Sequence, residues 1–273
     1  MFTTQERNNH FRSALGLMEL VYVSTVRQVR KSHSNALVGL LSNLLQTLVF
    51  VGAFYLMFSV LGLRGNAIRG DFILYLLSGI FLFLTHTKAV GAVMGSEGPT
   101  SAMMKHAPMN TAIAIMSSAL SSLYIQVLSA AVILFVVHVA WYPVYFYKPV
   151  PTIAMFLLAW ASGVSVGMCF LALKPWFPGL AGTLTMVYSR ANMIASGKMF
   201  VANTMPSYIL AFFDWNPLFH AIDQARGFAF INYNPHFSSI SYPVTLSLVL
   251  FMIGLMGEFY TRRHASISWS AGK

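Results

Sequence analysis

Apolar residues gather in six long segments, each close to the roughly 20 residues that a helix needs to cross a bilayer. The segments cover residues 36–61, 72–94, 112–139, 152–173, 177–197 and 243–260. This pattern predicts an all-α integral membrane protein in which residues 1–273 form one domain and residues 36–260 contain six transmembrane helices. Because six is an even number, both termini are expected on the same side of the membrane.

The residues before the first segment mix apolar and charged side chains. Between residues 14 and 29, apolar positions such as Leu17, Leu20 and Val21 recur at spacings of three and four, beside Glu19 and Arg27. This spacing predicts an amphipathic helix within residues 1–35 that lies in the membrane interface. An ordinary cytosolic lead-in is the alternative. Residues 1–34 contain no apolar core that ends in a small-residue cleavage site, so the amino end is expected to stay in the cytoplasm.

Composition supports the membrane assignment. Of the 273 residues, 57% are hydrophobic and only 9% are charged, and the mean hydropathy is +0.66. A soluble domain carries about 25% charged residues, so this chain is too apolar to cover itself with a water-compatible surface. The one cysteine, Cys169, excludes an intrachain disulfide and a zinc cluster of thiolates. In a membrane protein, the net charge of +10 more often reflects orientation and anionic lipid contacts than nucleic-acid binding.

Lysine and arginine are distributed unevenly over the two sides that six spans define. Ten of them fall in the two terminal tails and in the loops after the second and fourth spans, and five fall in the other loops. Cytoplasmic loops of membrane proteins carry the excess of basic residues. This two-to-one bias predicts that both termini, including residues 261–273, are cytoplasmic and that the polar stretch 190–233 lies outside.

Two cations, Lys88 and Arg190, fall within predicted spans. Charged side chains are costly in lipid and usually face a protein interior or a water-filled path, so both are candidate contacts for an anionic substrate. Snorkelling of Lys88 to the nearby interface is the alternative. None of the seven acidic residues lies in the middle of a span, which argues against a proton-coupled transporter. The lack of paired carboxylates in a common site argues against a membrane glycosidase or transferase.

The fragment Ser196-Gly197-Lys198-Met199 is similar to part of a phosphate-binding P-loop. That motif needs glycine six positions before the lysine and Ser or Thr directly after it. Asn192 and Met199 occupy those two positions, and the fragment follows an apolar span instead of a strand. The chain is therefore not expected to bind ATP through this fragment.

Residues 216–226 predict a short helix with Asn216 as its N-terminal cap and Pro217 in its first turn. His220, Asp223 and Arg226 follow Asn216 at spacings of four, three and three, which places them on one face. Asp223 and Arg226 are expected to pair there. This polar stripe is either structural or in contact with substrate, and the sequence slightly favours the structural role. A metal site at His220 and Asp223 is a weaker alternative.

Two loops carry further candidate features. In residues 96–108, Ser96 or Thr100 can cap a short helix that Pro108 ends, so this stretch is either a simple turn or the place where a cytoplasmic partner acts. Residues 141–147 are dense in aromatic side chains. A membrane-interface belt explains them, and stacking on the sugar rings of a passing substrate is the alternative.

Small residues recur at four-residue spacing in two predicted spans. They are Ala159, Gly163 and Gly167 in the fourth span, and Gly91 and Gly95 at the end of the second. Small side chains at this spacing allow two helices to approach closely. We therefore expect both sets to be helix-packing positions and not sites of chemistry.

The stretch before the last span contains a specific run of residues. The run consists of Ser196-Gly197, Phe200, Met205-Pro206, and Asn216-Pro217-Leu218 followed by His220, Asp223 and Arg226-Gly227. With these residues, the chain resembles the membrane subunits of ABC exporters of the type-2 permease family, and is most similar to the capsular polysaccharide and O-antigen export branch. The resemblance covers nearly the whole chain. Family members commonly carry glutamate where this chain has Asp223, so the charge is kept with a shorter reach.

The resemblance implies roles for two segments. Residues 198–240 would form a periplasmic insert of short re-entrant helices. Residues 96–108 would form a coupling helix that docks onto an ATPase, with Glu97, Thr100, Lys105 and Pro108 as its coupling residues. The chain itself would be a transport subunit and not an enzyme. It would need no cofactor of its own, because ATP and Mg²⁺ would bind to the partner ATPase.

The resemblance also implies an assembly and a cargo. Two copies of the chain would enclose the path and two cytoplasmic ATPase subunits would drive it, with periplasmic and outer-membrane export proteins as further partners and no nucleic acid involved. The cargo would be a lipid-linked capsular polysaccharide, exported across the inner membrane of a Gram-negative bacterium during capsule biogenesis. O-antigen, a teichoic-acid-like polymer or a small drug are the alternative cargoes. An ATP-independent channel or secondary transporter is the alternative from a different class.

Overall fold

The computed structural model describes residues 10–31, 36–60, 62, 68, 71–98, 110–141 and 143–264, and within these ranges the chain forms helices and turns without a strand. The long helices are α1 (His10–Lys31), α2 (Ala36–Val60), α3 (Phe72–Met94), α4 (Thr111–Ala140), α5 (Pro149–Leu173), α6 (Pro178–Ala195) and α9 (Ser241–His264). Between α6 and α9 lie the short helices η2 (Ala202–Thr204), α7 (Ser207–Leu210) and α8 (Pro217–Ala229). The prediction of an all-α protein is confirmed.

Five helices are long and apolar enough to cross a membrane. They are α2 over Val38–Val60, α3, α4, α5 and α9. The helix at the position of the fifth predicted span, α6, has 18 residues, carries Arg190 and Asn192, and is not one of these five. The chain is therefore a multi-pass membrane protein, while the sixth span, the interface position of α1 and the side of the termini stay predictions.

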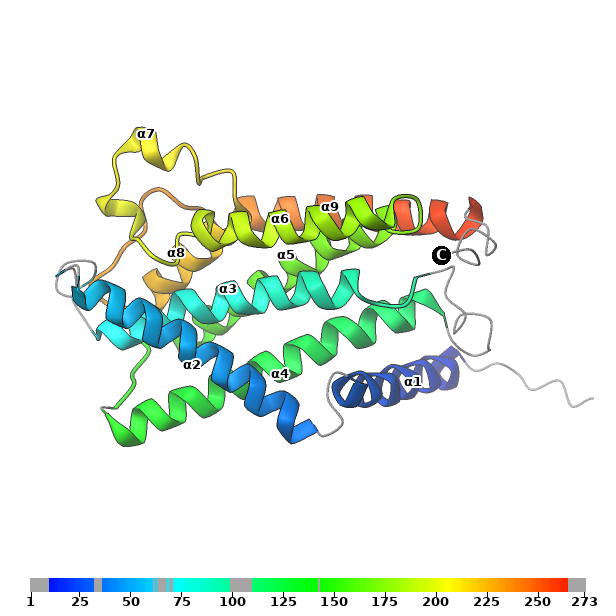
Figure 1. The fold of residues 1–273 in the computed structure, drawn as a ribbon, viewed down its shortest axis with the longest axis horizontal. Coiled ribbons are helices and arrows are strands. Elements are labelled where there is room, and N and C mark those ends of the chain that lie inside the picture. The colour runs from blue at the N-terminus through cyan, green and yellow to red at the C-terminus, as the bar shows by residue number, and fades with distance from the viewer. Residues whose placement is uncertain are drawn as a thin grey trace, which may run out of the picture.

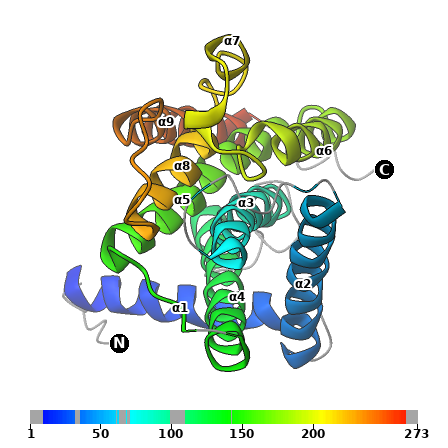
Figure 2. The ribbon, with the colours of Figure 1, turned by 90° about the vertical axis from the view of Figure 1, so that its left-hand side faces the viewer.

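The central helix of the bundle is α3. In its most apolar stretch 83% of the residues are buried inside the protein, whereas the corresponding value for α2 is 17%. The apolar residues of α3 therefore pack against other helices, and most of those of α2 face outward, as they do in a helix that contacts lipid. The helices α2 to α6 and α9 run along the long axis of the molecule (Figure 1), and α1 lies across them (Figure 2).

Small residues of α5 bring this helix close to α3. Ala159 is fully buried. A side chain at Gly163 would collide with the carbonyl oxygen of His86, and a Cβ at Gly167 would lie 2.9 Å from the carbonyl oxygen of Val90. The predicted packing role of Ala159, Gly163 and Gly167 is therefore confirmed, and it explains why α3 and α5 share an extensive contact.

The corresponding prediction for Gly91 and Gly95 is wrong. A Cβ built on Gly91 meets nothing within 4 Å, and one on Gly95 would meet the carbonyl oxygen of Gly91 in its own turn. Neither glycine lets another described helix of the chain approach. The four-residue spacing is the same in both sets, so the difference depends on which helix faces stand opposite each other.

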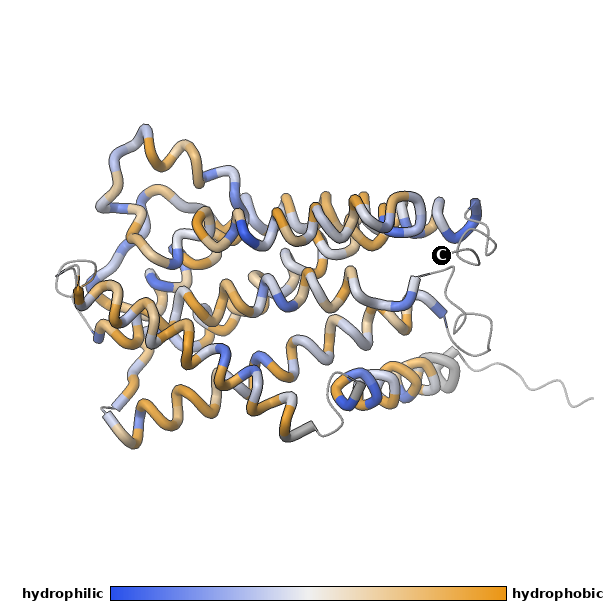
Figure 3. Tube along the Cα trace, in the orientation of Figure 1, coloured by the Kyte–Doolittle hydropathy of each residue, from blue (hydrophilic) through white to orange (hydrophobic). Residues whose placement is uncertain are grey.

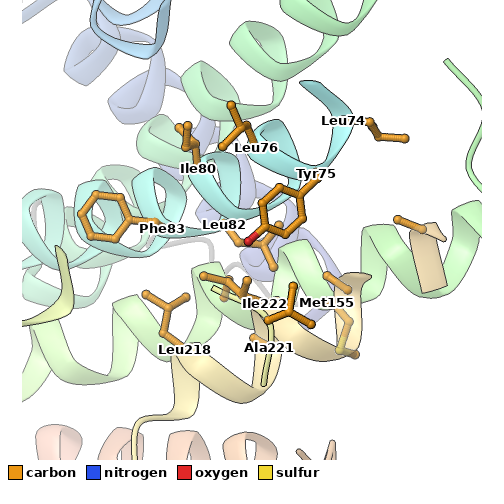
Figure 4. Packing of buried hydrophobic residues seen from close by; sticks show 14 of the residues in the cluster. Leu74, Tyr75, Leu76, Ile80, Leu82, Phe83, Met155, Leu218, Ala221 and Ile222 are labelled. Carbon is orange, nitrogen blue, oxygen red and sulfur yellow. The ribbon is translucent and has the colours of Figure 1, made fainter. Parts of the chain in front are cut away.

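The end of the bundle opposite the C-terminal end of α9 contains α7 and α8 (Figure 1). The helix α8 packs against α3, α5 and α9. Figure 4 shows its residues Leu218, Ala221 and Ile222 facing Tyr75 and Leu82 of α3, all within the main buried cluster. Hydrophobic contact with α3 therefore holds the insert between α6 and α9 in place.

Candidate functional site

The N-terminus of α8 is formed as the sequence predicts. Asn216 caps the helix, and its side-chain oxygen accepts a hydrogen bond from the Leu218 amide at 3.0 Å, with Pro217 in the first turn. The Asn216 amide group donates in turn to the side chain of Asn192 at 2.8 Å and to the carbonyl of Ala195 at 2.9 Å. The cap therefore also fastens α8 to the end of α6.

Arg226 is the largest side chain buried within the insert, with 1% of its surface exposed. Its guanidinium donates to the carbonyl oxygens of Gly197 at 2.9 Å, Lys198 at 2.6 Å and Phe200 at 2.6 Å. It also lies over the ring of Tyr75, 4.2 Å from the ring centre. Gly197 has a φ of 73°, a conformation that favours glycine, so its turn and Arg226 together set the path of the chain after α6.

Asp223 does not pair with Arg226, contrary to the sequence prediction. Its carboxylate accepts hydrogen bonds from the hydroxyl of Tyr233 and from that of Ser238 at 2.6 Å. Burial and the neighbouring Asp223 charge raise the pKa of Tyr233, so this phenol stays a hydrogen-bond donor. The two charged residues of α8 therefore hold different segments: Asp223 holds the residues after the helix, and Arg226 holds those after α6.

His220 completes the polar stripe, and both of its ring nitrogens are engaged. The Ser239 amide donates to Nδ1 at 3.1 Å, which leaves Nε2 to donate to the carbonyl of Asp214 at 2.5 Å. Among the residues that the structure describes, no three His, Cys, Asp or Glu side chains form a group that could hold a metal ion. The stripe of Asn216, His220, Asp223 and Arg226 thus makes internal contacts throughout, which favours its structural role.

Lys198 is a second buried cation, although the sequence predicts it only as a charge outside the spans and as part of a fragment similar to a P-loop. It is 1% exposed, donates to the carbonyl of Met193, and has its ammonium 3.8 Å from the ring centre of Phe83. Burial lowers the pKa of Lys198 to about 8. Lys198 directly follows the predicted apolar span 177–197, and this position in the sequence could have indicated a charge close to the protein core.

The two predicted substrate-contacting cations lie in different environments. Lys88 of α3 lines a polar cavity of about 380 Å³ at the junction of α1, α2, α3 and α4. Arg190 is exposed on α6 and is not among the residues that line this cavity. The structure therefore does not join Lys88 and Arg190 into one site.

The wall of the cavity contains amides that lie within otherwise apolar helices. Asn43 of α2 accepts a hydrogen bond from Gln126 of α4 at 3.1 Å and donates to Ser129 at 2.7 Å. Figure 3 shows such hydrophilic positions inside the apolar runs of α2 and α4. A search of the predicted spans for polar uncharged residues would have found Asn43 and Gln126, whereas a search for charges alone misses them.

Of the predicted coupling residues, Glu97 lies in the described part of the chain and Thr100, Lys105 and Pro108 lie outside it. Contacts hold both flanks of this stretch. The Lys174 ammonium donates to the carbonyls of Met94 at 3.2 Å and Ser96 at 3.4 Å, at the end of α3.

On the other flank, the hydroxyl of Thr111 donates to a carboxylate oxygen of Glu258 at 2.6 Å. Thr111 is the first residue of α4 and Glu258 lies in the last turns of α9. The stretch between α3 and α4 is thus fastened to the end of α5 on one side and to α9 on the other.

Comparison with known proteins agrees with this arrangement. Residues 19–230 match the family model described as ABC-2 type transporter. The match spans more than half of the chain. The chain belongs to the ABC-2 type transporter family. It is the membrane component of an ABC transporter, a transport subunit that is not itself catalytic, and this family works with an ATPase partner in general. No curated protein matches the chain.

The matched region of this ABC-2 permease starts within α1 and ends just after α8. It contains Lys88, Arg190 and the complete polar stripe of α8. It leaves out α9, although Glu258 of that helix contacts the first residue of α4. The tether between α4 and α9 therefore depends on a residue outside the family match.

Proposed function

We propose that this ABC-2 permease exports lipid-linked capsular polysaccharide across the inner membrane of a Gram-negative bacterium. Two copies of the chain enclose the path, and two copies of a separate cytoplasmic ATPase drive it. The family match supports the transport role. The run from Asn216 to Gly227 supports a glycan as cargo, because it resembles the corresponding run of the capsular polysaccharide export branch. Periplasmic and outer-membrane export proteins receive the polymer.

Exposed aromatic side chains near α8 support a carbohydrate cargo. Trp141 is 70% exposed, Tyr145 76%, and Trp215, in the insert, 57%. Backbone hydrogen bonds from Tyr147 to Ala229 and from Lys148 to Phe228 hold the aromatic loop against the end of α8. Aromatic faces stack on sugar rings, so this end of the bundle offers a surface for a polymer that leaves the path.

Coupling to the ATPase runs through residues 96–108. A push on this stretch is transmitted to α5 through Lys174 and to α9 through the Thr111–Glu258 hydrogen bond. Because both connections attach to long helices, a small movement at the docking site displaces two elements of the bundle. Glu97, Thr100, Lys105 and Pro108 are the residues that the ATPase contacts.

Glycan profiling of a deletion strain tests the cargo. Loss of export should leave a lipid-linked polymer in the cytoplasm and remove capsule from the surface, and the intact chain should restore it. Accumulation of an O-antigen or a teichoic-acid-like polymer would change the assigned cargo within the family. Unaltered surface and cytoplasmic glycans would contradict a polysaccharide cargo.

Reconstitution with the ATPase tests the coupling. Thr111→Val and Lys174→Met should lower the amount of polymer exported per ATP hydrolysed by roughly tenfold, the factor that corresponds to about 1.4 kcal/mol of a charge-assisted hydrogen bond. Thr183→Val and Lys148→Met are matched controls, because both residues are exposed and neither takes part in the Lys174 or the Thr111–Glu258 contacts. Export that proceeds without ATP would instead support a channel or secondary transporter.

A further inference from the structure

The polar cavity at the junction of α1 to α4 has the lining of a binding site for an anion with hydroxyl groups. Its described lining contains one charged side chain, Lys88, and no acidic one. Around Lys88 stand amides and hydroxyls that both donate and accept hydrogen bonds. The main ones are Gln28, Asn43, Gln46, Ser122 and Gln126.

Two neighbouring residues of this lining are unsatisfied: Lys88, and Thr87, whose buried hydroxyl has no hydrogen-bond partner in the described part of the chain. Within the described part of the chain, the Lys88 ammonium takes part in no hydrogen bond or ion pair. Two of the lining amides, by contrast, are fixed: Gln126 is 2% exposed and Asn43 is 7% exposed, and they bond to each other. A cation within a membrane helix is costly unless an anion or a wet path compensates it. The cavity therefore has a rigid neutral wall and one free positive charge.

Space for a ligand lies one turn from Lys88. A Cβ on Gly91 would meet nothing within 4 Å, and Gly91 lines the cavity in the last turn of α3. Leu41 and Leu45 of α2, which directly precede the lining residues Ser42 and Gln46 in the sequence, are 66% and 61% exposed. Polar residues thus make up most of the lining, and exposed leucines on the same helix offer an apolar surface that suits acyl chains.

We propose that this cavity binds the phosphate-bearing, hydroxyl-rich headgroup of an anionic lipid. The phosphate lies at the Lys88 ammonium, the hydroxyls bond to the amides of α2 and α4, and the acyl chains lie along Leu41 and Leu45. The inference rests on the proposed function in one point: a headgroup of this kind would be the lipid end of the exported lipid-linked glycan. Lipid binding itself is independent of transport.

Phosphatidylglycerol is a suitable probe, because its headgroup carries a phosphate and two hydroxyls. The full-length chain is placed in nanodiscs with equal amounts of phosphatidylglycerol and phosphatidylcholine, and the retained lipids are measured by native mass spectrometry. Wild-type protein should retain phosphatidylglycerol preferentially. Lys88→Gln should lower that preference about tenfold, and Lys88→Arg should restore most of it.

Gly91→Leu supplies a second variant that keeps the charge. Its side chain occupies the open space and should exclude the headgroup, with a comparable loss of phosphatidylglycerol. Gly182→Leu is the matched control, because Gly182 is a helical glycine on α6 that also has nothing within 4 Å of a Cβ and does not line the cavity. It should bind lipid like the wild type.

Equal preference for phosphatidylglycerol in wild type, Lys88→Gln and Gly91→Leu would overturn the proposal. Displacement of the lipid by soluble glycerol phosphate at equal concentration would also overturn it, because the site would then bind a free anion. Normal surface glycans in the deletion strain would refute the cargo proposed above and leave the lipid site standing. The two ideas therefore fail separately.

Discussion

Arg226 holds the insert together from its interior, and its replacement tests that role. Three carbonyl groups of residues 197–200 accept hydrogen bonds from the guanidinium, and the ring of Tyr75 lies beneath it. Alanine at this position leaves these carbonyls without their donor in a buried setting. We expect Arg226→Ala to destabilise the protein and to loosen the chain between α6 and η2 first.

The magnitude follows from the number of contacts. Hydrogen bonds in membrane proteins average about 0.6 kcal/mol, so three of them contribute about 2 kcal/mol. The cation–π contact with Tyr75 adds roughly 1 kcal/mol. Relief from burying a cation without a carboxylate partner offsets a part of this sum. We expect the free energy of unfolding to fall by about 2–3 kcal/mol, and Arg226→Lys to recover less than half because an ammonium lacks the planar fork.

Unfolding of the full-length chain in mixed micelles, followed by tryptophan fluorescence during an SDS titration, measures this difference. Arg190→Ala is the matched control: Arg190 is exposed on α6, so its replacement should change stability by no more than about 0.5 kcal/mol. Hydrogen exchange of residues 197–205 should accelerate in Arg226→Ala only. Equal stability of the Arg226 and Arg190 variants would refute the reasoning.

Three further outcomes are expected in the same assay. A Cβ on Gly79 would lie 2.8 Å from a guanidinium nitrogen, so Gly79→Ala should cost about 1–3 kcal/mol, while Gly182→Ala, with open space, should not destabilise. Lys198 has a pKa of about 8 in the folded protein against an ordinary 10.5, so between these pH values the unfolded chain binds more protons than the folded one. The free energy of unfolding should therefore rise between pH 8 and 10.5 by about 3 kcal/mol. Lys198→Met should flatten that rise, and an unchanged slope in this variant would contradict the assignment to Lys198. Gly163→Leu should abolish folding and Gly91→Leu should not, and the reverse order would disprove the packing assignment.

Much of the fold follows from local sequence patterns. Apolar runs gave the positions of α2 to α5 and α9 to within a few residues, and Asn216 with Pro217 marked the start of α8. These features depend on neighbours along one helix: the length of an apolar run and the cap of a first turn are both visible in the sequence. The weaker apolar character of α6, which carries Arg190 and Asn192, leaves its role as a sixth span a prediction.

The partners of individual side chains could not be predicted in the same way. Asp223 and Arg226 share a helix face, yet their hydrogen bonds go to Ser238 and to residues 197–200, which are segments on either side of α8 that its packing brings into contact with it. The small residues at Gly163 and Gly91 have the same spacing, yet only the first meets another helix.

The sequence by itself determined that the chain is a helical membrane protein and where its long helices lie. Those properties follow from composition and from spacing within single segments. Only the tertiary structure decided that Lys88 faces a polar cavity while Arg190 is exposed, and that Thr111 meets Glu258 from 147 positions away. Each of these facts is a distance between helices, and such distances are set by the packing of whole helix faces, which no single segment encodes.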